Sequence, residues 1–260
     1  MPESNTVAKT AHVPRLFVLA GTNGAGKSSI GGATIRARGG QYFNPDEAAA
    51  RIRDAQPHLS ATQANSAAWH EGKLLLQHAI AQGMDYNFET TLGGKSFSSL
   101  LKAAAEQGFE VRIWYVGLAS PEHHLARVKA RVKKGGHDIP EADIRRRFDQ
   151  SRLQLIELLP HVAELRVYDN SDEADPHQGK APRPRLVLHW QQTGMQSGQR
   201  QAAVLAPATP QALADTPEWA KPVVMAAFKQ QASEAAKTPT KPAKDASPAG
   251  ARPKRNRPAK

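Results

Sequence analysis

One segment near the start of the chain combines glycines, a lysine and serines at the spacing of a phosphate-binding loop. Residues 21–28 read GTNGAGKS, which matches the Walker A pattern, and Ser29 follows it. The glycines let the backbone curl so that several N–H groups point inward at phosphate oxygens. Lys27 supplies a mobile positive charge to the β- and γ-phosphates, and Ser28 offers a hydroxyl to Mg²⁺. The alternative is a glycine-rich turn without nucleotide, but the loop stands between an apolar strand and a helix, as the motif requires.

We therefore expect ATP and Mg²⁺ as cofactors, with Ser28 as the metal ligand. The sequence has no Asn/Thr-Lys-x-Asp guanine signature, which argues against a GTPase. It also has no second large domain or remodelling motif of the kind that an ATPase motor carries. The residues predicted to bind the nucleotide from this loop are Gly21, Asn23, Gly24, Ala25, Gly26, Lys27, Ser28 and Ser29.

Two acidic residues follow predicted strands and are candidates for chemistry at the γ-phosphate. Asp46, in the segment FNPDE, could accept the proton of an acceptor hydroxyl as the phosphoryl group is transferred. It could also be an acid that favours the dipole of a helix N-terminus, and its residue context leaves both readings open. Glu89, in the segment NFETT, could bind substrate hydroxyls or contribute to the magnesium site beside Thr90. Its alternative is an exposed acid at a strand end.

A basic segment in the middle of the chain predicts a lid. Two helices, from about Pro121 to Lys134 and from Pro140 onward, are separated by a break that contains Gly135 and Gly136. Such a lid closes over ATP, and its arginines neutralise the charge of the transferring phosphoryl group. Several of these arginines must instead form a solvated face, because they cannot all reach one phosphate. The six arginines are Arg127, Arg131, Arg145, Arg146, Arg147 and Arg152.

The elements that position these residues alternate between strands and helices, which predicts an α/β fold of the P-loop kinase type. Such alternation predicts a parallel sheet flanked by helices, with the helical lid at about residues 121–160. The expected strands are 15–20, 41–43, 86–89, 109–117, 165–168 and 186–189. Besides the lid helices, the expected helices are 27–37, 45–54, 61–82 and 97–107.

Composition limits the remaining possibilities. The chain has 260 residues, no cysteine, and no apolar run of the roughly 20 residues that a membrane span requires. We therefore expect neither disulfides, thiolate metal sites nor membrane contact. Since residues 1–14 lack the apolar core of a secretory signal, we expect a cytoplasmic protein.

The net charge of +11 lies mostly in a tail. Residues 229–260 hold nine basic residues against two acidic ones, and almost no large apolar side chain follows Phe228. We expect this tail to be disordered, with weak non-specific nucleic-acid contact as one role and solubilisation as another. The expected organisation is a flexible N-terminus (1–13), a kinase domain (14–206), a linker with a short docking helix (207–228) and the basic tail (229–260).

Over residues 14 to 190 the sequence resembles the zeta-toxin family, and more closely its compact chromosomal branch. The segments that carry the resemblance are GTNGAGKSS, FNPDE, NFETTL, YVGLASPEHHLARVKARVKKGGHDIPEADIRRRF and VYDNS. The long lid segment is far more specific than the phosphate loop. The chain departs from plasmid-borne members in that its acid sits in NPDE rather than in an isolated-Asp context, and in that it carries its own basic tail.

The resemblance implies an ATP-dependent kinase of a toxin–antitoxin system that phosphorylates UDP-N-acetylglucosamine on the 3′-hydroxyl of its amino sugar. Asp46 would be the general base, and Arg131 and Arg147 would stabilise the transition state beside Lys27. Asn170 would lie near the adenine. An antitoxin would be a separate chain or would use the C-terminal segment. The residues assigned to the sugar-nucleotide substrate are Glu89, Thr90 and Arg127.

Two alternatives stay open at the level of sequence. One is a kinase of another hydroxylated metabolite, because the fold and loop serve enzymes with many substrates. The other is a nucleotide-dependent nucleic-acid-binding ATPase that uses the basic tail.

Overall fold

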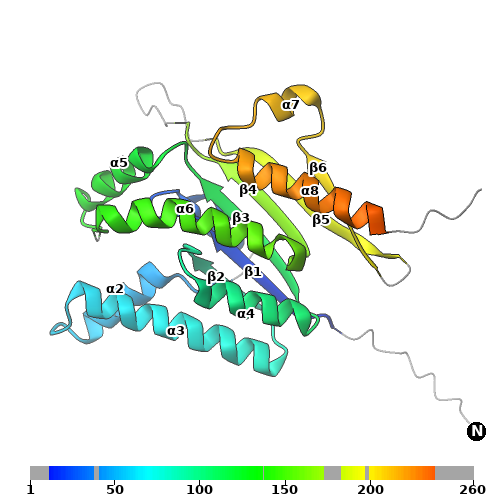
Figure 1. Ribbon diagram of the computed structural model, residues 1–260. Helices are drawn as coiled ribbons and strands as arrows, with labels where there is room; N and C mark the ends of the chain where they lie inside the picture. The colour runs from blue at the N-terminus through cyan, green and yellow to red at the C-terminus, as the bar shows by residue number, and fades with distance from the viewer. Residues whose placement is uncertain (1–11, 38–40, 137, 173–182, 197–198, 238–260) are drawn as a thin grey trace, which may run out of the picture.

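The computed structural model describes residues 12–37, 41–136, 138–172, 183–196 and 199–237, and these build a mixed α/β fold around one sheet (Figure 1). The sheet has six strands in the order β2-β1-β3-β4-β5-β6. The strands are β1 (Arg15–Ala20), β2 (Tyr86–Thr90), β3 (Glu110–Gly117), β4 (Glu164–Asp169), β5 (Arg185–Gln196) and β6 (Gln199–Ala206).

The helices begin and end where local sequence directs them. Ser60 and Gln63 form a reciprocal capping box at the start of α3, and Gly83 ends that helix in the left-handed conformation. Pro121 occupies the first turn of α5. The α-helices are α1 (Ala33–Ala37), α2 (Pro45–Ala55), α3 (Ala61–Gln82), α4 (Lys95–Glu106), α5 (Pro121–Val132), α6 (Glu141–Leu158), α7 (Pro210–Ala214) and α8 (Lys221–Lys237).

One face of the sheet carries the main core. Helices α4, α6 and α8 lie side by side over this face, whereas α2 and α3 lie beyond β2 (Figure 1). Alternate residues of the strands point into the layer between, so that Leu16, Ile113, Val167 and Trp190 are fully buried. Among the described residues, no helix combines the length and the apolar character that a membrane crossing demands.

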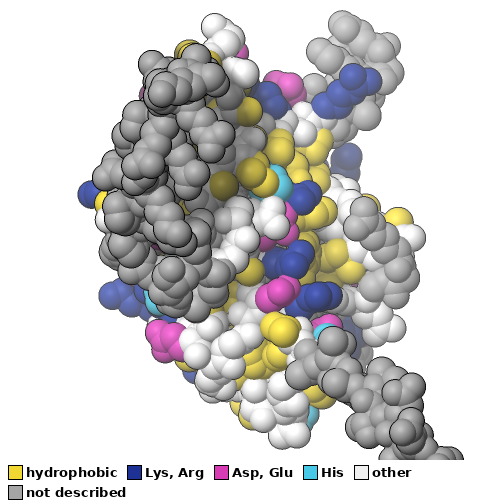
Figure 2. Space-filling model, turned by 90° about the vertical axis from the view of Figure 1, so that its right-hand side faces the viewer, with side chains coloured by type: hydrophobic (Ala, Val, Ile, Leu, Met, Phe, Trp, Pro, Cys, Tyr) yellow, Lys and Arg dark blue, Asp and Glu magenta, His cyan; other side chains and the backbone are white. Residues whose placement is uncertain are grey.

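The other face of the sheet carries charged side chains near the starts of the strands. Arg112 contacts Glu110 within β3 and reaches Glu164 on β4, which also accepts from Arg166. Basic and acidic side chains accordingly stand side by side among hydrophobic ones on this flank of the molecule (Figure 2). The polar residues of the candidate site lie at the opposite, carboxyl ends of the strands.

The expected α/β fold is confirmed, but the sheet is not wholly parallel. Strands β1 to β4 are parallel, whereas β5 and β6 run antiparallel to their neighbours. An antiparallel neighbour needs no crossover helix, so β5 and β6 follow each other directly along the chain. The sequence analysis missed β6 and ended β5 too early, at residue 189.

Two further expectations are corrected near the phosphate loop. The strand expected at 41–43 is reduced to one isolated bridge between Phe43 and Phe88, because α2 begins directly afterwards at Pro45. The helix expected at 27–37 opens with a π-helical turn, η1 (Ser28–Gly32), before α1. Such turns are rare in proteins overall, and those that occur are often found at functional sites.

The C-terminal segment packs on the domain as expected, although its helix is longer. Trp219, Val223, Val224 and Ala227 are buried in the main core. Helix α8 continues to Lys237, so the first nine residues of the predicted tail are helical, and the rest of that tail lies outside the described residues.

We expect Trp219→Ala to lower the free energy of unfolding by about 3–5 kcal/mol, the usual cost of deleting a buried tryptophan. The indole is 4% exposed and donates from Nε1 to Asp169 at 3.1 Å. Urea denaturation measures the change. The matched control is Met225→Ala on the same helix, where the side chain is 59% exposed and the expected change is within about 0.5 kcal/mol. Equal effects of the two substitutions would contradict the docking.

Candidate active site

The phosphate loop follows β1 and is pressed against β3. Gly21 has a φ of +136°, and a Cβ on it would lie 2.1 Å from the carbonyl oxygen of Val116. A side chain at this position is therefore excluded both by conformation and by space. The loop then leads into the π-helical turn η1, and within the loop the Ala25 N–H donates to the Thr22 carbonyl oxygen at 3.2 Å.

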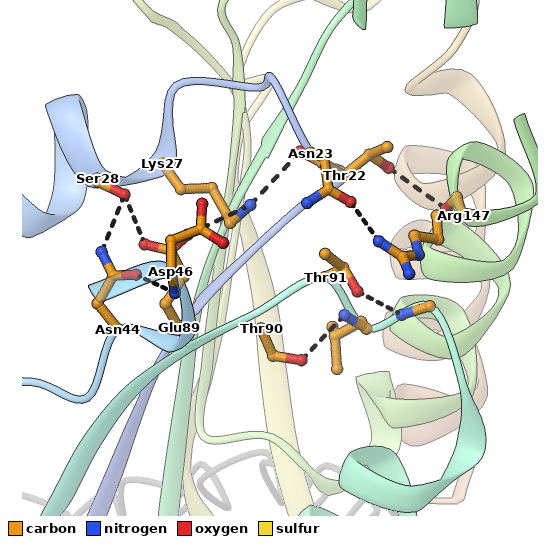
Figure 3. Close-up of polar contacts among 12 residues, drawn as sticks. Thr22, Asn23, Lys27, Ser28, Asn44, Asp46, Glu89, Thr90, Thr91 and Arg147 are labelled. Atoms are coloured by element: carbon orange, nitrogen blue, oxygen red, sulfur yellow. Dashed lines mark hydrogen bonds and ion pairs between the residues drawn. The ribbon is translucent and has the colours of Figure 1, made fainter. Parts of the chain in front are cut away.

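Lys27 and Ser28 meet Glu89 at the carboxyl ends of β1 and β2 (Figure 3). The Lys27 Nζ lies 3.4 Å from Glu89 Oε1, and the Ser28 hydroxyl donates to Glu89 Oε2 at 2.8 Å. The Lys27 ammonium also reaches the carbonyl oxygen of Thr22 at 3.4 Å. Lys27 is 6% exposed and Glu89 7%, so two opposite charges share a desolvated site. The sequence assigned these residues to one site, and the structure brings them into contact.

The donor set at this point suits magnesium bound together with a nucleotide. The Ser28 hydroxyl and the Glu89 carboxylate are hard oxygen ligands 2.8 Å apart. Mg²⁺ is usually held by one or two carboxylates together with phosphate oxygens rather than by a complete protein cage. Consistent with this, the described part of the chain has no group of three or more His, Cys, Asp or Glu side chains that could hold a metal alone. Ser28 and Glu89 are the residues that would hold the ion.

Asp46 stands in the first turn of α2, opposite the lid. Asn44 caps this helix, and its Oδ1 accepts from the backbone N–H of Asp46 at 2.9 Å. The Asn44 amide nitrogen is 3.4 Å from the Ser28 hydroxyl, which ties the start of α2 to the phosphate loop. Arg131 of α5 donates to Asp46 Oδ2 at 3.0 Å. The two readings of Asp46 thus coincide, since it lies at a helix N-terminus and also beside Ser28 and Glu89 (Figure 3).

The predicted lid is formed by α5 and α6, and it contacts the phosphate loop directly. Arg147 donates through Nη1 to Asn23 Oδ1 at 2.7 Å and through Nη2 to Asp143 at 3.2 Å. Thr22 donates from its hydroxyl to the backbone carbonyl oxygen of Arg147 at 3.3 Å. Burial lowers the pKa of Arg147 from its ordinary value, although Asp143 and Asp46 favour its charged form. The guanidinium is still charged at neutral pH.

The other arginines of the lid serve different purposes. Arg145 pairs with Glu122 and Glu141 on the lid surface, and Arg152 pairs with Asp149. These are the solvated and structural arginines that the sequence analysis anticipated without identifying them.

A pocket of ≈ 310 Å³ opens between α2, the β2–α4 connection and the lid. Asp46, Glu89 and Thr90 line it on one side and Arg147 on the other. Sequence reasoning did not find its aromatic wall, because these side chains come from three separate elements. That wall consists of Phe43, Trp69 and Phe97.

Arg127 and Asn170 lie elsewhere, beside the back of the phosphate loop. The Asn170 amide donates to the carbonyl oxygen of Ala25 at 2.9 Å, and Arg127 donates to the Asn170 carbonyl oxygen at 2.7 Å. Asn170 thus contacts the phosphate loop, and its expected place near the adenine stays a prediction. Arg127 was assigned to the substrate with Glu89 and Thr90, yet it is not among the residues that line the pocket. Ser29, the last predicted loop residue, is exposed at the surface of η1.

His124 is a further polar residue at the loop that sequence reasoning missed. Its ring is 1% exposed and its Nδ1 lies 2.8 Å from the carbonyl oxygen of Asn23. Burial lowers the pKa of His124 to about 4, with smaller contributions from Lys27 and Arg127. Its place in a run of two histidines gave no sign that one of them faces the core.

Comparison with known proteins shows to which family the chain is related. The model of a family described as zeta toxin matches residues 3–180 of the 260. The chain belongs to the zeta toxin family. The expected resemblance is therefore confirmed. The matched region contains the phosphate loop, Asp46, Glu89 and the lid.

Other similar proteins support the relationship and the fold. An uncharacterized protein of Haemophilus influenzae is 37% identical over 129 residues, which cover 49% of this chain and 88% of the relative. A structure of the AvrRxo1-ORF1:-ORF2 complex has a TM-score of 0.54 at 16% identity, covering 86% of this chain and 74% of the other. A structure of AvrRxo1-ORF1:-ORF2 with ATP has a TM-score of 0.52 at 18% identity.

The chain spans only part of the ATP-bound structure, covering 58% of that chain with 68% of its own length. At such identities the likeness concerns the fold alone. Family membership, together with the phosphate loop, supports an ATP-dependent phosphotransferase.

The stability of the protein should fall in mild acid because of His124. The folded ring has a pKa of about 4 against 6.5 in the unfolded chain, so between these values the unfolded chain alone gains a proton. Between pH 7.5 and pH 5 we expect this residue to reduce the free energy of unfolding by about 2 kcal/mol. Urea denaturation at both pH values measures it. In His124→Asn, which has no titrating ring, the pH dependence should be weaker by that amount, and an unchanged dependence would contradict a neutral His124.

Proposed function

We propose that the protein is an ATP-dependent kinase that phosphorylates the 3′-hydroxyl of the amino sugar of UDP-N-acetylglucosamine. The observation that carries this proposal is the convergence of Asp46, Glu89 and Arg147 on one pocket next to Lys27 and Ser28. A hydrolase would need only a water site at the phosphate loop. A pocket lined by two carboxylates and a lid arginine has room for a hydroxylated acceptor instead.

The residues divide the reaction between proton transfer and charge stabilisation. Asp46 accepts the proton of the acceptor hydroxyl while that oxygen forms its bond to the γ-phosphorus and the bond to ADP breaks. For this, Asp46 must leave the ion pair in which Arg131 holds it at 3.0 Å, and the freed Arg131 then faces the phosphoryl group. Lys27 and Arg147 stabilise the negative charge on the transferred oxygens.

Glu89 and Ser28 have the second task of placing the nucleotide. Mg²⁺ bound to ATP would neutralise charge on the β- and γ-phosphates and fix their orientation. Ser28 and Glu89 would hold that ion, and the Lys27 ammonium, 3.4 Å from Glu89, would contact the β- and γ-phosphates.

The acceptor fits the rest of the pocket. Glu89 can accept a hydrogen bond from a sugar hydroxyl and Thr90 can donate one, and Arg146 of the same pocket would pair with the negative charge of the diphosphate. Phe43, Trp69 and Phe97 offer apolar faces to the sugar or to the uracil ring. Since this acceptor is a precursor of the cell wall, we further propose that the protein acts as the toxin of a toxin–antitoxin system and that a separate antitoxin protein is its partner.

Asp46→Asn should lower turnover by about 10²- to 10⁴-fold with little change in ATP affinity, because an amide cannot accept the proton of the acceptor hydroxyl. The measurement is ADP release by the purified protein with and without UDP-N-acetylglucosamine, together with detection of the phosphorylated product. Other hydroxylated metabolites tested side by side distinguish the alternative kinase. Acceptor-independent ATP hydrolysis, or wild-type turnover in Asp46→Asn, would overturn the proposal.

A matched control is available on the same helix. Asp54→Asn makes the same chemical change at the other end of α2, where Asp54 is exposed. Its turnover should equal that of the wild type.

Removing residues 238–260 should leave kinase turnover within about twofold of the wild type, because every residue assigned to the site lies between positions 21 and 170. The cut follows α8, so the docked helix stays intact. Binding of a single-stranded oligonucleotide at low and moderate salt is measured on the same two proteins. Loss of kinase turnover together with loss of salt-dependent binding would favour the nucleic-acid-binding alternative.

A further inference from the structure

His124 and Arg147 approach the same residue of the phosphate loop from the two helices of the lid. The His124 ring of α5 contacts the Asn23 backbone carbonyl oxygen at 2.8 Å, and Arg147 of α6 donates to the Asn23 side-chain oxygen at 2.7 Å. The backbone of α5 also packs closely on the loop, since a Cβ on Gly24 would lie 2.8 Å from the carbonyl oxygen of His124. Asn23 is 8% exposed, so water is largely excluded from these contacts.

The direction of the hydrogen bond follows from the chemistry of its two atoms. The Asn23 carbonyl oxygen can only accept, so His124 Nδ1 carries the proton. A buried carbonyl oxygen without a donor is unfavourable, so this contact gives the Asn23–Gly24 peptide one preferred orientation. Phe148 packs edge-on against the ring at 5.7 Å and restrains the ring position.

The orientation of this peptide matters for phosphate binding. In a trans peptide the C=O of one residue and the N–H of the next point in opposite directions. With the Asn23 carbonyl held against His124, the Gly24 N–H points away from α5. Phosphate-binding loops function by directing such N–H groups inward.

We propose that His124 is a positioning residue for nucleotide binding: its Nδ1–H fixes the Asn23–Gly24 peptide so that the Gly24 N–H faces the bound phosphates. Arg147 donates to the side chain of the same Asn23. The conformation of the loop and the placement of Arg147 are therefore coupled through one residue. The inference rests on the proposed binding of ATP, but it does not depend on which acceptor is phosphorylated.

The experiment is a calorimetric titration of the full-length protein with ATP and Mg²⁺, without any acceptor. In His124→Leu the ring volume is roughly kept and the donor is lost, and we expect the Kd for ATP to rise at least tenfold. His124→Asn places an amide N–H near the position of Nδ1 and should restore the Kd to within about threefold of the wild type. An unchanged Kd in His124→Leu, or an equally weak Kd in both variants, would overturn the proposal.

A packing control separates positioning from stability. Phe148→Leu disturbs the contact with the His124 ring but leaves the donor, so thermal stability should fall while the Kd for ATP stays within about threefold of the wild type. The ADP-release assay with UDP-N-acetylglucosamine is independent of this titration. A negative result in that assay counts against the proposed acceptor, whereas a negative result in the titration counts against the positioning role.

A measurement on the wild-type protein avoids variants altogether. Long-range ¹H–¹⁵N spectra of the histidine rings identify which nitrogen of His124 carries the proton. The Nδ1–H tautomer is expected, and the Nε2–H tautomer would overturn the proposal because Nδ1 would then have nothing to donate to Asn23.

Discussion

The contact between Lys27, Ser28 and Glu89 is the interaction on which the rest of the site depends. Lys27 and Glu89 are each more than nine-tenths buried, and neither charge would be tolerated there alone. Removing one partner of such a pair costs about 3–5 kcal/mol because the other is left uncompensated in a poorly solvated place. The contact holds one cation and two oxygen ligands together at the carboxyl ends of β1 and β2.

Two long-range constraints make this contact possible. The parallel pairing of β1 with β2 sets Ala20 beside Thr90, so the phosphate loop and Glu89 leave the sheet at the same edge. The pairing of β1 with β3 presses Gly21 against Val116, which bends the loop back over that edge. The N-terminus of α2 then brings Asp46 to the same place through the amide of Asn44.

The lid is not an independent flap in this conformation. Arg131 holds Asp46, Arg147 holds Asn23, and Thr22 donates to the backbone of α6, so both lid helices contact residues of the site. Asp46 is thus paired with Arg131, whereas Arg147 is hydrogen-bonded to the loop and paired with Asp143. A lid of this kind couples substrate binding to rearrangement of charge, because each ligand group must displace an existing ion pair or hydrogen bond.

Features that depend on local order were predicted from the sequence alone. Glycine spacing identified the phosphate loop, the apolar run of β1 indicated its context, and the helical stretch expected at 61–82 coincides with α3. Glu89 was expected at the end of a strand and lies at the carboxyl end of β2, whereas Asp46 lies in the first turn of α2 rather than after a strand of the sheet. The family resemblance likewise rested on contiguous segments of the chain.

Only the tertiary structure decided which of several equivalent residues reach the site. Six arginines lie between positions 127 and 152, yet Arg147 meets Asn23 whereas Arg127 turns to Asn170 and Arg145 to the lid surface. His124 and its neighbour His123 are alike in sequence, and burial against the loop distinguishes them. The antiparallel β6 and the aromatic wall of the pocket were also missed. Arg147 and His124 contact Asn23 across 124 and 101 residues of sequence, so their roles depend on helix packing that short-range patterns do not encode.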